Sequence, residues 1–387
     1  MVYNKLLMKN QKSLKVLHIT THLNIGGISS YLLILGSGMI KKGHQVCVLS
    51  SGGGLSEEFK EREFHLLQFN IKTKSELNPK LYWALPQIIR LVKEKKFDII
   101  HAHTRVTQVL AYFIARATGV PVVTTAHGYY KPRFGRRLFG CWGGRTIAIS
   151  PLVAEELKNS HAVDPSRIKV VQNAIDTEDF LRRLAQKNTS AVRKEYGIDE
   201  KAVVLGSVSR LVQDKGHEYL VKALSALRKK NVNAFLLILG DGRERDNLQK
   251  LIKDLNLERH VKLVPGEKDV TKVLSVMDIF VHPATFREGF GLSMMEAMIA
   301  GKPVVVTDIW AVNSYIKNAV NGYLVEPKNT QALADAIHRV ISDPSLSKQV
   351  AEEGRRMAAE ICSLDRMTGE TEAVYQEAIE EGHGKRF

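Results

Sequence analysis

The chain has 387 residues, which at roughly 150 residues per domain is enough for two to three folding units. Apolar residues make up 44% and charged residues 25%, so extensive disorder, collagen-like structure and coiled coils are excluded. The three cysteines cannot form a disulfide framework and indicate a reducing compartment. The longest charge-free stretch, 16–40, is too polar for a lipid-facing helix and has no cleavage-site pattern, so we expect neither a membrane span nor a signal peptide.

The net charge of +15 is unevenly distributed. Residues 1–180 contain 25 basic and 13 acidic residues, a net of +12, whereas residues 181–387 contain 31 and 28, a net of +3. No acidic residue occurs between Ile99 and Ala154. A basic field of this kind indicates an anionic partner: lipid headgroups, nucleic acid or a phosphorylated substrate. Solvated side chains that keep the protein soluble are the alternative. No nucleic-acid-binding module is recognisable, so nucleic acid is not expected as a partner.

Short apolar runs alternate with amphipathic helical stretches, which predicts parallel α/β layers. In the first half the predicted strands are 14–20, 44–50, 65–69, 97–103, 121–127, 145–150 and 169–173. Helices are expected between them, such as 28–42 and 79–95, the latter with Asn78 as its N-cap and Pro79 at its first position. Residues 1–178 are predicted to form an N-terminal domain.

A polar stretch without strand signals, 179–200, is predicted to be a linker to a C-terminal domain at 201–363. The strands predicted in that second series are 203–210, 235–241, 261–266, 278–284, 303–308 and 322–327. The final helix, about 364–387, is expected to rejoin the first domain. The predicted fold class is α/β, with two doubly wound sheets that bind ligands in a cleft at the facing carboxyl ends of their strands.

Two motifs at strand ends suit phosphate groups. Gly26 and Gly27 precede a helix whose first amides and dipole favour an anion, although a tight turn is the structural alternative and the pattern is not G-x-G-x-x-G. Arg210 and Lys215 flank the turn after the first strand of the second series. Two cations beside a helix N-terminus are suited to a diphosphate, with ordinary surface charges as the alternative.

The strongest motif is REGFGLSMMEAMIAGKPVV at 287–305. Glu288 lies in a loop, and Glu296 lies eight positions later in a helix that begins near 290–292. The glycines allow backbone amides to approach phosphate oxygens, and Glu296 is placed to accept two hydroxyl hydrogens from a ribose. The alternative is that both glutamates only complement the helix N-terminus.

These motifs together resemble glycosyltransferase family 4, a family of retaining enzymes with the GT-B fold. The resemblance covers nearly the whole chain in register. It is carried by Gly26–Gly27, His127–Gly128, the IS-P start of a helix at Ser150, VVQNAID at 170–176, Arg210 and Lys215, LGDG at 239–242, Glu288 and Glu296, and NGYLVEP at 321–327.

The resemblance implies a nucleotide-diphosphate sugar as the donor, UDP- or GDP-linked, and a glycan or lipid-linked acceptor. The resemblance implies that the diphosphate is held by Arg210, Lys215 and the backbone of Phe290, Gly291 and Leu292. Glu296 holds the ribose, the backbone near Val264 and Gly266 reads the base, and Glu288 holds the sugar hydroxyls. Gly27 approaches the phosphates, and His127 faces the transferring sugar, either orienting it or helping proton transfer. Gly26 is also among the predicted substrate-binding residues.

Neither a metal nor another cofactor is expected, because the sequence has no Asp-x-Asp pair and no His or Cys ligand spacing. His101 and His103 alternate at a strand end, where roles in the core or lining the cleft are favoured over metal ligation. The family's usual Gly-Gly-x-x-Glu after 303–308 is replaced here, with Trp310 and Ser314 at two of its positions, which leaves the donor sugar open. A sugar-nucleotide epimerase and a transferase for a soluble acceptor remain the alternative functions.

The segment 129–145 has five basic residues and no acidic residue. If it is helical, its aromatic residues face one side and its arginines the other, as in a helix lying in the headgroup region of a membrane. The residues predicted to face the membrane are Arg133, Phe134, Arg136, Arg137, Phe139 and Trp142. This pattern predicts a cytoplasmic enzyme, peripheral on the inner face of the membrane, in cell-envelope polysaccharide synthesis; a loop packed on the first domain is the alternative.

Overall fold

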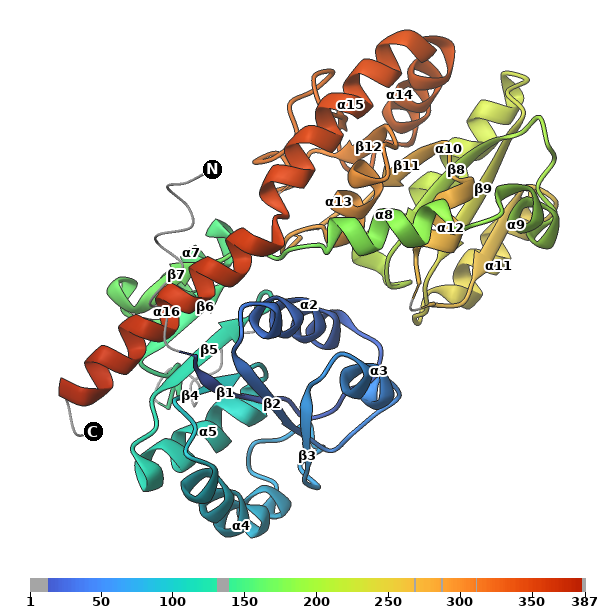
Figure 1. The fold of residues 1–387 in the computed structure, drawn as a ribbon. Coiled ribbons are helices and arrows are strands. Elements are labelled where there is room, and N and C mark those ends of the chain that lie inside the picture. Colours follow the sequence, from blue (N-terminus) through green and yellow to red (C-terminus); the bar gives the residue numbers. More distant parts are fainter. Residues whose placement is uncertain (1–12, 131–138, 268, 287, 311, 385–387) are drawn as a thin grey trace. The chain divides into compact units, whose positions relative to one another are not determined.

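The computed structural model describes residues 13–130, 139–267, 269–286, 288–310 and 312–384 (Figure 1). The chain divides into two compact units. The first comprises Met1–Ala174 and Leu364–Phe387, and the second comprises Ile175–Ser363. Within the described residues, no helix is long and apolar enough to cross a lipid bilayer.

The first unit is built on a seven-stranded parallel sheet. Its strands are β1 (Lys15–Ile19), β2 (Gln45–Ser50), β3 (His65–Gln68), β4 (Ile99–Ala102), β5 (Val122–Ala126), β6 (Arg145–Ala148) and β7 (Ile168–Val170). Its helices are α2 (Gly27–Lys41), α3 (Ser56–Glu61), α4 (Pro79–Lys95), α5 (Arg105–Thr118), α7 (Pro151–His161), the 3₁₀ turn η2 (Pro165–Arg167) and α16 (Leu364–Gly384). The strand order is β3-β2-β1-β4-β5-β6-β7. Every predicted strand of this half is therefore present, within a few residues of its expected ends.

The two faces of this sheet are covered differently. Leu17 of β1 and Ile100 of β4 belong to an apolar core that includes buried residues of α4 and α5. Because successive side chains of a strand point to opposite faces, His18 and His101 lie on the other face, where both are fully buried. That second face packs Tyr375 of α16 against His101. One side of the sheet is thus an ordinary hydrophobic layer, and the other contains buried polar groups.

Helix α16 is tied to the first unit by a buried carboxylate. Glu372, which is 2% exposed, accepts hydrogen bonds from His44 Nε2 at 2.5 Å and Lys42 Nζ at 2.6 Å. The amide of Leu14 donates to Nδ1 of His44 at 3.0 Å, so the ring hydrogen of His44 is on Nε2. The pKa of Glu372 would be raised by its burial, but the hydrogen bonds from His44 and Lys42 lower it. The carboxylate therefore stays ionised inside the packed interface between α16 and α2.

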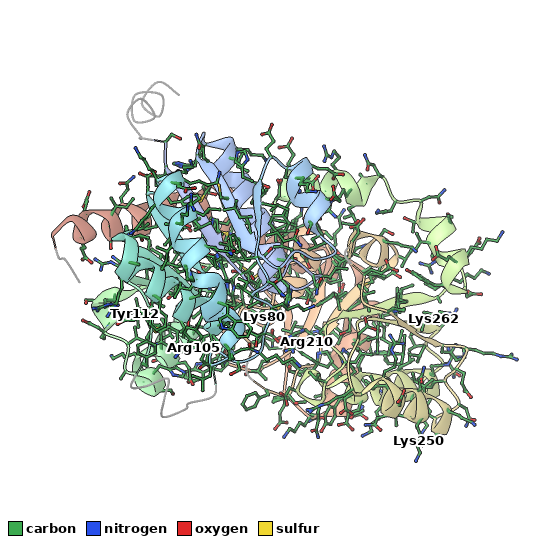
Figure 2. The ribbon with its side chains drawn as sticks, turned by 90° about the horizontal axis from the view of Figure 1, so that it is seen from below. Lys80, Arg105, Tyr112, Arg210, Lys250 and Lys262 are labelled. Atoms are coloured by element: carbon green, nitrogen blue, oxygen red, sulfur yellow. The ribbon has the colours of Figure 1, made fainter. Side chains whose placement is uncertain are left out.

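The second unit is built on a six-stranded parallel sheet with the order β10-β9-β8-β11-β12-β13. Its strands are β8 (Val203–Val208), β9 (Ala234–Leu239), β10 (Val261–Val264), β11 (Ile279–His282), β12 (Val304–Thr307) and β13 (Tyr323–Val325). Its helices are α8 (Thr177–Ala185), α9 (Thr189–Tyr196), the 3₁₀ turn η3 (Gln213–Lys215), α10 (His217–Lys229), α11 (Arg245–Asp254), α12 (Thr271–Val276), α13 (Leu292–Ile299), α14 (Thr330–Ser342) and α15 (Pro344–Ile361). Edge strand β10 exposes Lys262 (Figure 2), a charge that discourages pairing with another chain.

The segment predicted to be a linker is folded instead. Residues 179–200 lie mostly in α8 and α9, which pack on α12 and belong to the second unit. Each helix is polar on most of its surface and buries only a few residues, Phe180 in α8 and Val192 and Tyr196 in α9. Both helices are shorter than the window of about 11 residues over which a helical period can be counted in a sequence. The first unit also ends at Ala174 rather than at 178.

The buried carboxylate of α16 gives a stability prediction. Replacing Glu372 with Ala leaves His44 and Lys42 without their acceptor and is expected to lower the free energy of unfolding by about 3 kcal/mol, the lower end for breaking a buried ion pair, because Lys42 retains access to water. Because the pKa of Glu372 is lowered by folding, its contribution is present above the unfolded value of about 4.3 and is lost as the pH falls through the folded value. Calorimetric unfolding at pH 7 and at a series of pH values below 4 measures both effects.

The control is Glu370→Ala on the same helix, which removes only a partly exposed pair with Arg366. That variant is expected to change the free energy of unfolding by less than about 1 kcal/mol. A Glu372→Ala protein as stable as the control at pH 7 would contradict the assigned role of the buried carboxylate.

Candidate active site

Both sheets have a point at which the strand order reverses, between β1 and β4 in the first unit and between β8 and β11 in the second. In open α/β sheets, ligands bind outside the carboxyl ends of the strands at this point. Gly26 and Gly27 follow β1, and Arg210 follows β8. Glu288 follows β11 and precedes α13. The predicted site residues thus fall at the two places where this fold offers a crevice.

Three side chains converge at the reversal point of the second unit. Lys215, the last residue of η3, donates from Nζ to Oε2 of Glu288. His282, at the end of β11, has Nε2 only 3.3 Å from the same carboxylate oxygen and is 3% exposed. The structure therefore brings together the predicted cation and the predicted loop glutamate, and it adds a histidine that the sequence analysis did not assign to the site.

The electrostatics of this group keep Glu288 charged. Burial alone would raise the pKa of the Glu288 carboxyl, but the neighbouring imidazole of His282 and the charge of Lys215 lower it to about 2. At neutral pH the carboxylate is therefore an acceptor of hydrogen bonds and not a proton donor. The positive charge of Lys215 is paired with the carboxylate of Glu288, so an incoming anion competes with that carboxylate for the ammonium group.

Arg210 differs from Lys215 because it is exposed at the end of the β8 loop. Among the described residues its guanidinium has neither a hydrogen-bond nor an ion-pair partner. Figure 2 shows Arg210 well separated from Lys250, a lysine on α11. A free guanidinium beside a site is available for bidentate binding of phosphate oxygens.

Two glycines with left-handed backbone conformations shape this region. Gly216 has φ of 65°, and an added Cβ would collide with the carbonyl oxygen of Pro283. Gly291 has φ of 76° and is the N-cap of α13, and an added Cβ would lie 3.9 Å from Cγ of Glu288. The first turn of α13, beginning at Leu292, therefore lies next to Glu288 with its leading amides outside the helical hydrogen-bond pattern. Phe290 is buried and packs edge-to-face on Tyr315 at 5.8 Å.

Glu296, one turn into α13, has a different environment. Burial raises the pKa of its carboxyl to about 7; Arg183 of α8 opposes this shift, and Asp269 adds to it. Asp269 in turn binds Arg183 Nη1 at 2.8 Å and Lys187 Nζ at 2.7 Å. No hydrogen bond joins the Glu296 carboxylate to the part of the chain that the structure describes. A half-buried acceptor of this kind fits the pair of hydroxyl groups of a ribose.

The backbone near Val264 and Gly266, predicted to read a base, is partly engaged within the unit. The amide of Gly266 donates to Oδ2 of Asp241 at 2.8 Å, and the carbonyl of Val264 accepts from the amide of Gly240 at 3.0 Å. Backbone recognition here therefore cannot use the Gly266 amide while Asp241 holds it.

In the first unit, Gly26 caps α2 and Gly27 begins it. In the described chain, a Cβ added at either glycine would meet no atom within 4 Å. The open space beside both residues leaves room for a ligand against the backbone at this helix N-terminus, where the dipole favours an anion.

His127 follows β5 and is half-buried. Its Nε2 lies 3.2 Å from Nδ1 of His103, and its ring packs edge-to-face on Tyr31 with centroids 4.6 Å apart. Burial lowers the pKa of His127 to about 3, so its imidazole is neutral at physiological pH. The predicted contact residue is therefore part of a polar interior and not an isolated side chain on a loop.

His18, His101 and His103 lie close enough together to offer three nitrogens to a metal ion. Both nitrogens of His101 and both of His103 lie within hydrogen-bond distance of another side chain. His101 contacts Tyr375 Oη and Thr125 Oγ1, each at 2.6 Å, and His103 contacts His18 and His127. A metal would have to displace these hydrogen bonds, so the arrangement fits a polar network better than a metal site.

The segment predicted to face a membrane departs from expectation. Trp142 is 7% exposed and packs near Tyr130 and His161, and residues 139–144 are not helical. Its burial corrects the assignment of Trp142 to a membrane-facing helix, which rested on a helical conformation that residues 139–144 do not have. Phe139 is exposed but contacts the ring of Tyr112 at 5.1 Å. Arg133, Phe134, Arg136 and Arg137 lie outside the described residues.

Comparisons with known proteins identify the family to which the chain belongs. The family model for glycosyl transferases group 1 matches residues 188–357, and that for Glycosyltransferase Family 4 matches residues 25–179. An uncharacterised glycosyltransferase of Methanocaldococcus jannaschii is 27% identical over 92% of this chain and 95% of its own. The UDP-Gal:alpha-D-GlcNAc-diphosphoundecaprenol alpha-1,3-galactosyltransferase of Escherichia coli is 29% identical over 68% of this chain and 71% of its own.

The fold is shared with a solved structure of Anabaena HepE in complex with UDP-glucose. That structure has a TM-score of 0.79 and 22% identity, and the match covers 93% of this chain and 99% of that one. The expected GT-B fold, two parallel-sheet α/β domains, is therefore confirmed. The two family models together span most of the sequence, and the chain belongs to the group 1 glycosyltransferases, family 4.

Proposed function

We propose that the protein is a retaining glycosyltransferase that moves a hexosyl or N-acetylhexosaminyl group from a UDP- or GDP-linked sugar to an acceptor hydroxyl without a metal ion. The observation that carries this proposal is the Lys215–Glu288 pair beside the N-terminus of α13, with Glu296 one turn further along that helix. On this proposal the cation and the helix amides would hold the diphosphate, Glu296 the ribose and Glu288 the sugar. The complex of HepE with UDP-glucose supports a nucleotide-sugar donor.

The reaction breaks the bond between the anomeric carbon and the diphosphate, so negative charge grows on the leaving group and positive charge on the sugar. Arg210 and Lys215 would stabilise the leaving phosphate together with the amides at the start of α13. Glu288, held ionised, would accept hydrogen bonds from sugar hydroxyls. Retention would follow from displacement on the same face of the sugar, with the leaving phosphate taking the proton of the acceptor hydroxyl.

A panel of UDP- and GDP-sugars, each incubated with and without glycan and polyprenyl-diphosphate acceptors, tests the proposal. Transfer with retained anomeric configuration, unchanged by a chelator, is the expected result. Interconversion of the donor without any acceptor would instead indicate a sugar-nucleotide epimerase. Activity lost in chelator and restored by manganese would overturn the metal-independent mechanism.

The phosphate assignment predicts a large loss of transfer from a single charge. Arg210→Ala is expected to lower kcat by about two orders of magnitude, because one well-placed donor to a developing oxyanion stabilises the transition state by ~3–4 kcal/mol. Arg210 has no partner among the described residues, so this variant leaves no buried charge behind. Lys250→Ala is the matched control, since it removes an exposed cation of the same unit on α11. Near-normal turnover of Arg210→Ala at saturating donor would refute the assignment.

The ribose assignment predicts a pH dependence of nucleotide binding. Because the pKa of Glu296 is about 7, lowering the pH from 8 to 6 protonates the carboxylate that would accept both ribose hydroxyls. The affinity for UDP, or for GDP, is therefore expected to fall over this range in calorimetry. Glu288, with a pKa of about 2, does not titrate there.

Glu296→Gln is the control for that titration. The nucleotide affinity of this variant still depends on pH through the ionisation of the nucleotide's own terminal phosphate. The difference between the two curves reports Glu296 alone. Glu288→Ala is expected to impair turnover more than nucleotide affinity. Equal losses of affinity in Glu288→Ala and Glu296→Gln would reject the division of roles between the two glutamates.

For the acceptor, we propose a lipid-linked or lipopolysaccharide-type glycan at the cytoplasmic face of the membrane. The diphosphoundecaprenol-linked acceptor of the E. coli relative supports this class. With Trp142 buried, the best-fitting surface is the start of α4, where Leu77 and Trp83 are 78% and 79% exposed. Tyr82 is also exposed, and Lys72, Lys74 and Lys80 lie in the same stretch, with Lys80 labelled in Figure 2. Exposed aromatic and basic residues together are typical of a headgroup-facing surface.

This surface predicts salt-sensitive binding to anionic vesicles. The double variant Leu77→Ser, Trp83→Ser is expected to stay in the supernatant of a sedimentation assay, whereas the native protein sediments at low salt and is released as salt rises. Trp310→Ser removes an exposed tryptophan of the second unit and is the matched control. Native protein that stays in the supernatant at low salt would refute the membrane proposal and favour a soluble acceptor.

A further inference from the structure

Three histidines of the first unit form a continuous hydrogen-bonded chain from the sheet interior to the predicted sugar contact. Nδ1 of His18 lies 2.9 Å from Nε2 of His103, and Nδ1 of His103 lies 3.2 Å from Nε2 of His127. His18 and His103 are fully buried, whereas His127 is half-buried. Each of these two contacts joins a nitrogen of one ring to a nitrogen of the next, so one hydrogen must lie between the two nitrogens.

The sheet register assembles this chain. His18 and His101 are direct register partners in β1 and β4, and His103 follows two residues after His101 on the same face. The amide of His103 extends the ladder by donating to the carbonyl of Ile19 at 3.2 Å. His127 follows β5, the next strand of the sheet, so the chain runs along the carboxyl edge near the strand reversal.

Burial makes all of these rings neutral at physiological pH, because it lowers the pKa of His18 and of His127 to about 3 and that of His103 well below its usual value. A neutral imidazole has one N–H and one bare nitrogen. The hydrogens of the chain can therefore point in only two ways: all outward, toward His127, or all inward, toward His18.

The two directions differ at the inner end. Nε2 of His18 is buried and has no hydrogen-bond partner in the described structure. The inward direction would place a hydrogen on that nitrogen and leave a buried N–H donor without an acceptor, an arrangement that is rarer in proteins than an under-satisfied acceptor. The outward direction leaves only a bare lone pair there and places the last N–H on Nδ1 of His127, the nitrogen that His103 does not contact.

We propose that His18 and His103 are positioning residues that fix His127 as a hydrogen-bond donor through its Nδ1–H, which excludes a role for His127 as a general base. The identity of the group that receives this hydrogen bond, a hydroxyl of the donor sugar, rests on the proposed function. The tautomer itself rests only on the chain of histidines.

The chain does not act as a proton relay. To turn His127 Nδ1 into a base, His127 would have to give up its Nδ1 hydrogen while the shared hydrogens moved from His18 to His103 and from His103 to His127, and a proton would have to enter at His18 Nε2. That nitrogen has neither solvent nor a described partner to exchange with. Because His18 Nε2 cannot exchange a proton, the direction of the hydrogens in the chain is fixed.

His101 provides a matched control within the same cluster. Its ring stacks on His103 with centroids 4.2 Å apart, but its nitrogens bond to Tyr375 and Thr125 and not to the chain. A change at His101 perturbs packing in the same interior without breaking the contacts between His18, His103 and His127.

The first experiment is NMR of the full chain labelled with ¹⁵N-histidine, with His127→Gln used to assign the His127 ring signals. The expected spectrum has His127 protonated at Nδ1 and bare at Nε2, and His103→Leu is expected to release this preference. A native His127 protonated at Nε2 would overturn the proposal. This measurement needs no transfer activity, so it decides the tautomer even if the proposed function fails.

The second experiment is a double-mutant cycle on sugar transfer. His103→Leu is expected to lower kcat/KM by about 10- to 100-fold, as removal of an orienting partner does elsewhere, and to have almost no further effect in the His127→Gln background. His103→Asn, whose amide nitrogen can replace Nδ1, is expected to restore part of the loss. A His103→Leu effect that persists undiminished in His127→Gln, or one matched by His101→Asn, would show a structural role and overturn the positioning role.

Discussion

The register of β1 against β4 is the constraint on which the first unit depends. It places His18 directly beside His101 on a fully buried face. Because alternate residues of a strand share a face, His103 lies on that face as well. Most nitrogens of buried imidazoles find hydrogen-bond partners. The rest of that face supplies them: Thr125 from β5 and Tyr375 from α16 bond the two nitrogens of His101.

This constraint also explains why the chain returns to its first unit after completing the second. Tyr375 and Glu372 both lie on α16, and both bury polar atoms that bond histidines distant in sequence. Without α16, the polar face of the sheet would lose the acceptor of His44 and a partner of His101. The C-terminal helix is thus part of the fold of the first unit and not an appendage of the second.

Much of the architecture follows from the sequence because its signals are local. Parallel strands are short apolar runs, and the α/β alternation fixes their order along the chain, so the strands fall within a few residues of their predicted ends. The predicted linker failed because α8 and α9 bury few residues each, and Trp142 was misplaced because a helical period was assumed where the described residues form no helix.

The parts of the site that could not be predicted depend on residues far apart in the sequence. Arg183 and Asp269 meet across 86 positions beside Glu296, and Lys215 and Glu288 across 73. The motifs identify Lys215 and Glu288 as polar residues at strand ends but not as partners, and Arg183 and Asp269 belong to no motif. His282 stands in a strand that the sequence does predict, and its position at the carboxyl end was the one signal that could have assigned it to the site.

The two glutamates show how environment separates the roles of identical side chains. Lys215 and His282 lie beside Glu288 and stabilise its charge, whereas desolvation raises the pKa of the half-buried Glu296 and Arg183 only opposes this shift. The first is a permanent anion, and the second changes charge near neutral pH. On the proposed function, the permanent anion would serve the sugar, where positive charge develops, and the titrating one would serve the ribose, which is chemically unchanged.

The same reasoning applies to the neutral histidines of the first unit. A sugar whose anomeric carbon becomes positive in the transition state would be destabilised by an imidazolium nearby, because like charges repel most strongly where water is excluded. Burial of His127 prevents that charge, and the hydrogen-bonded chain behind it still supplies a polarised N–H. A neutral donor with a fixed direction therefore orients a hydroxyl group without opposing the charge that the reaction creates, which a lone, solvated histidine near its usual pKa could not do.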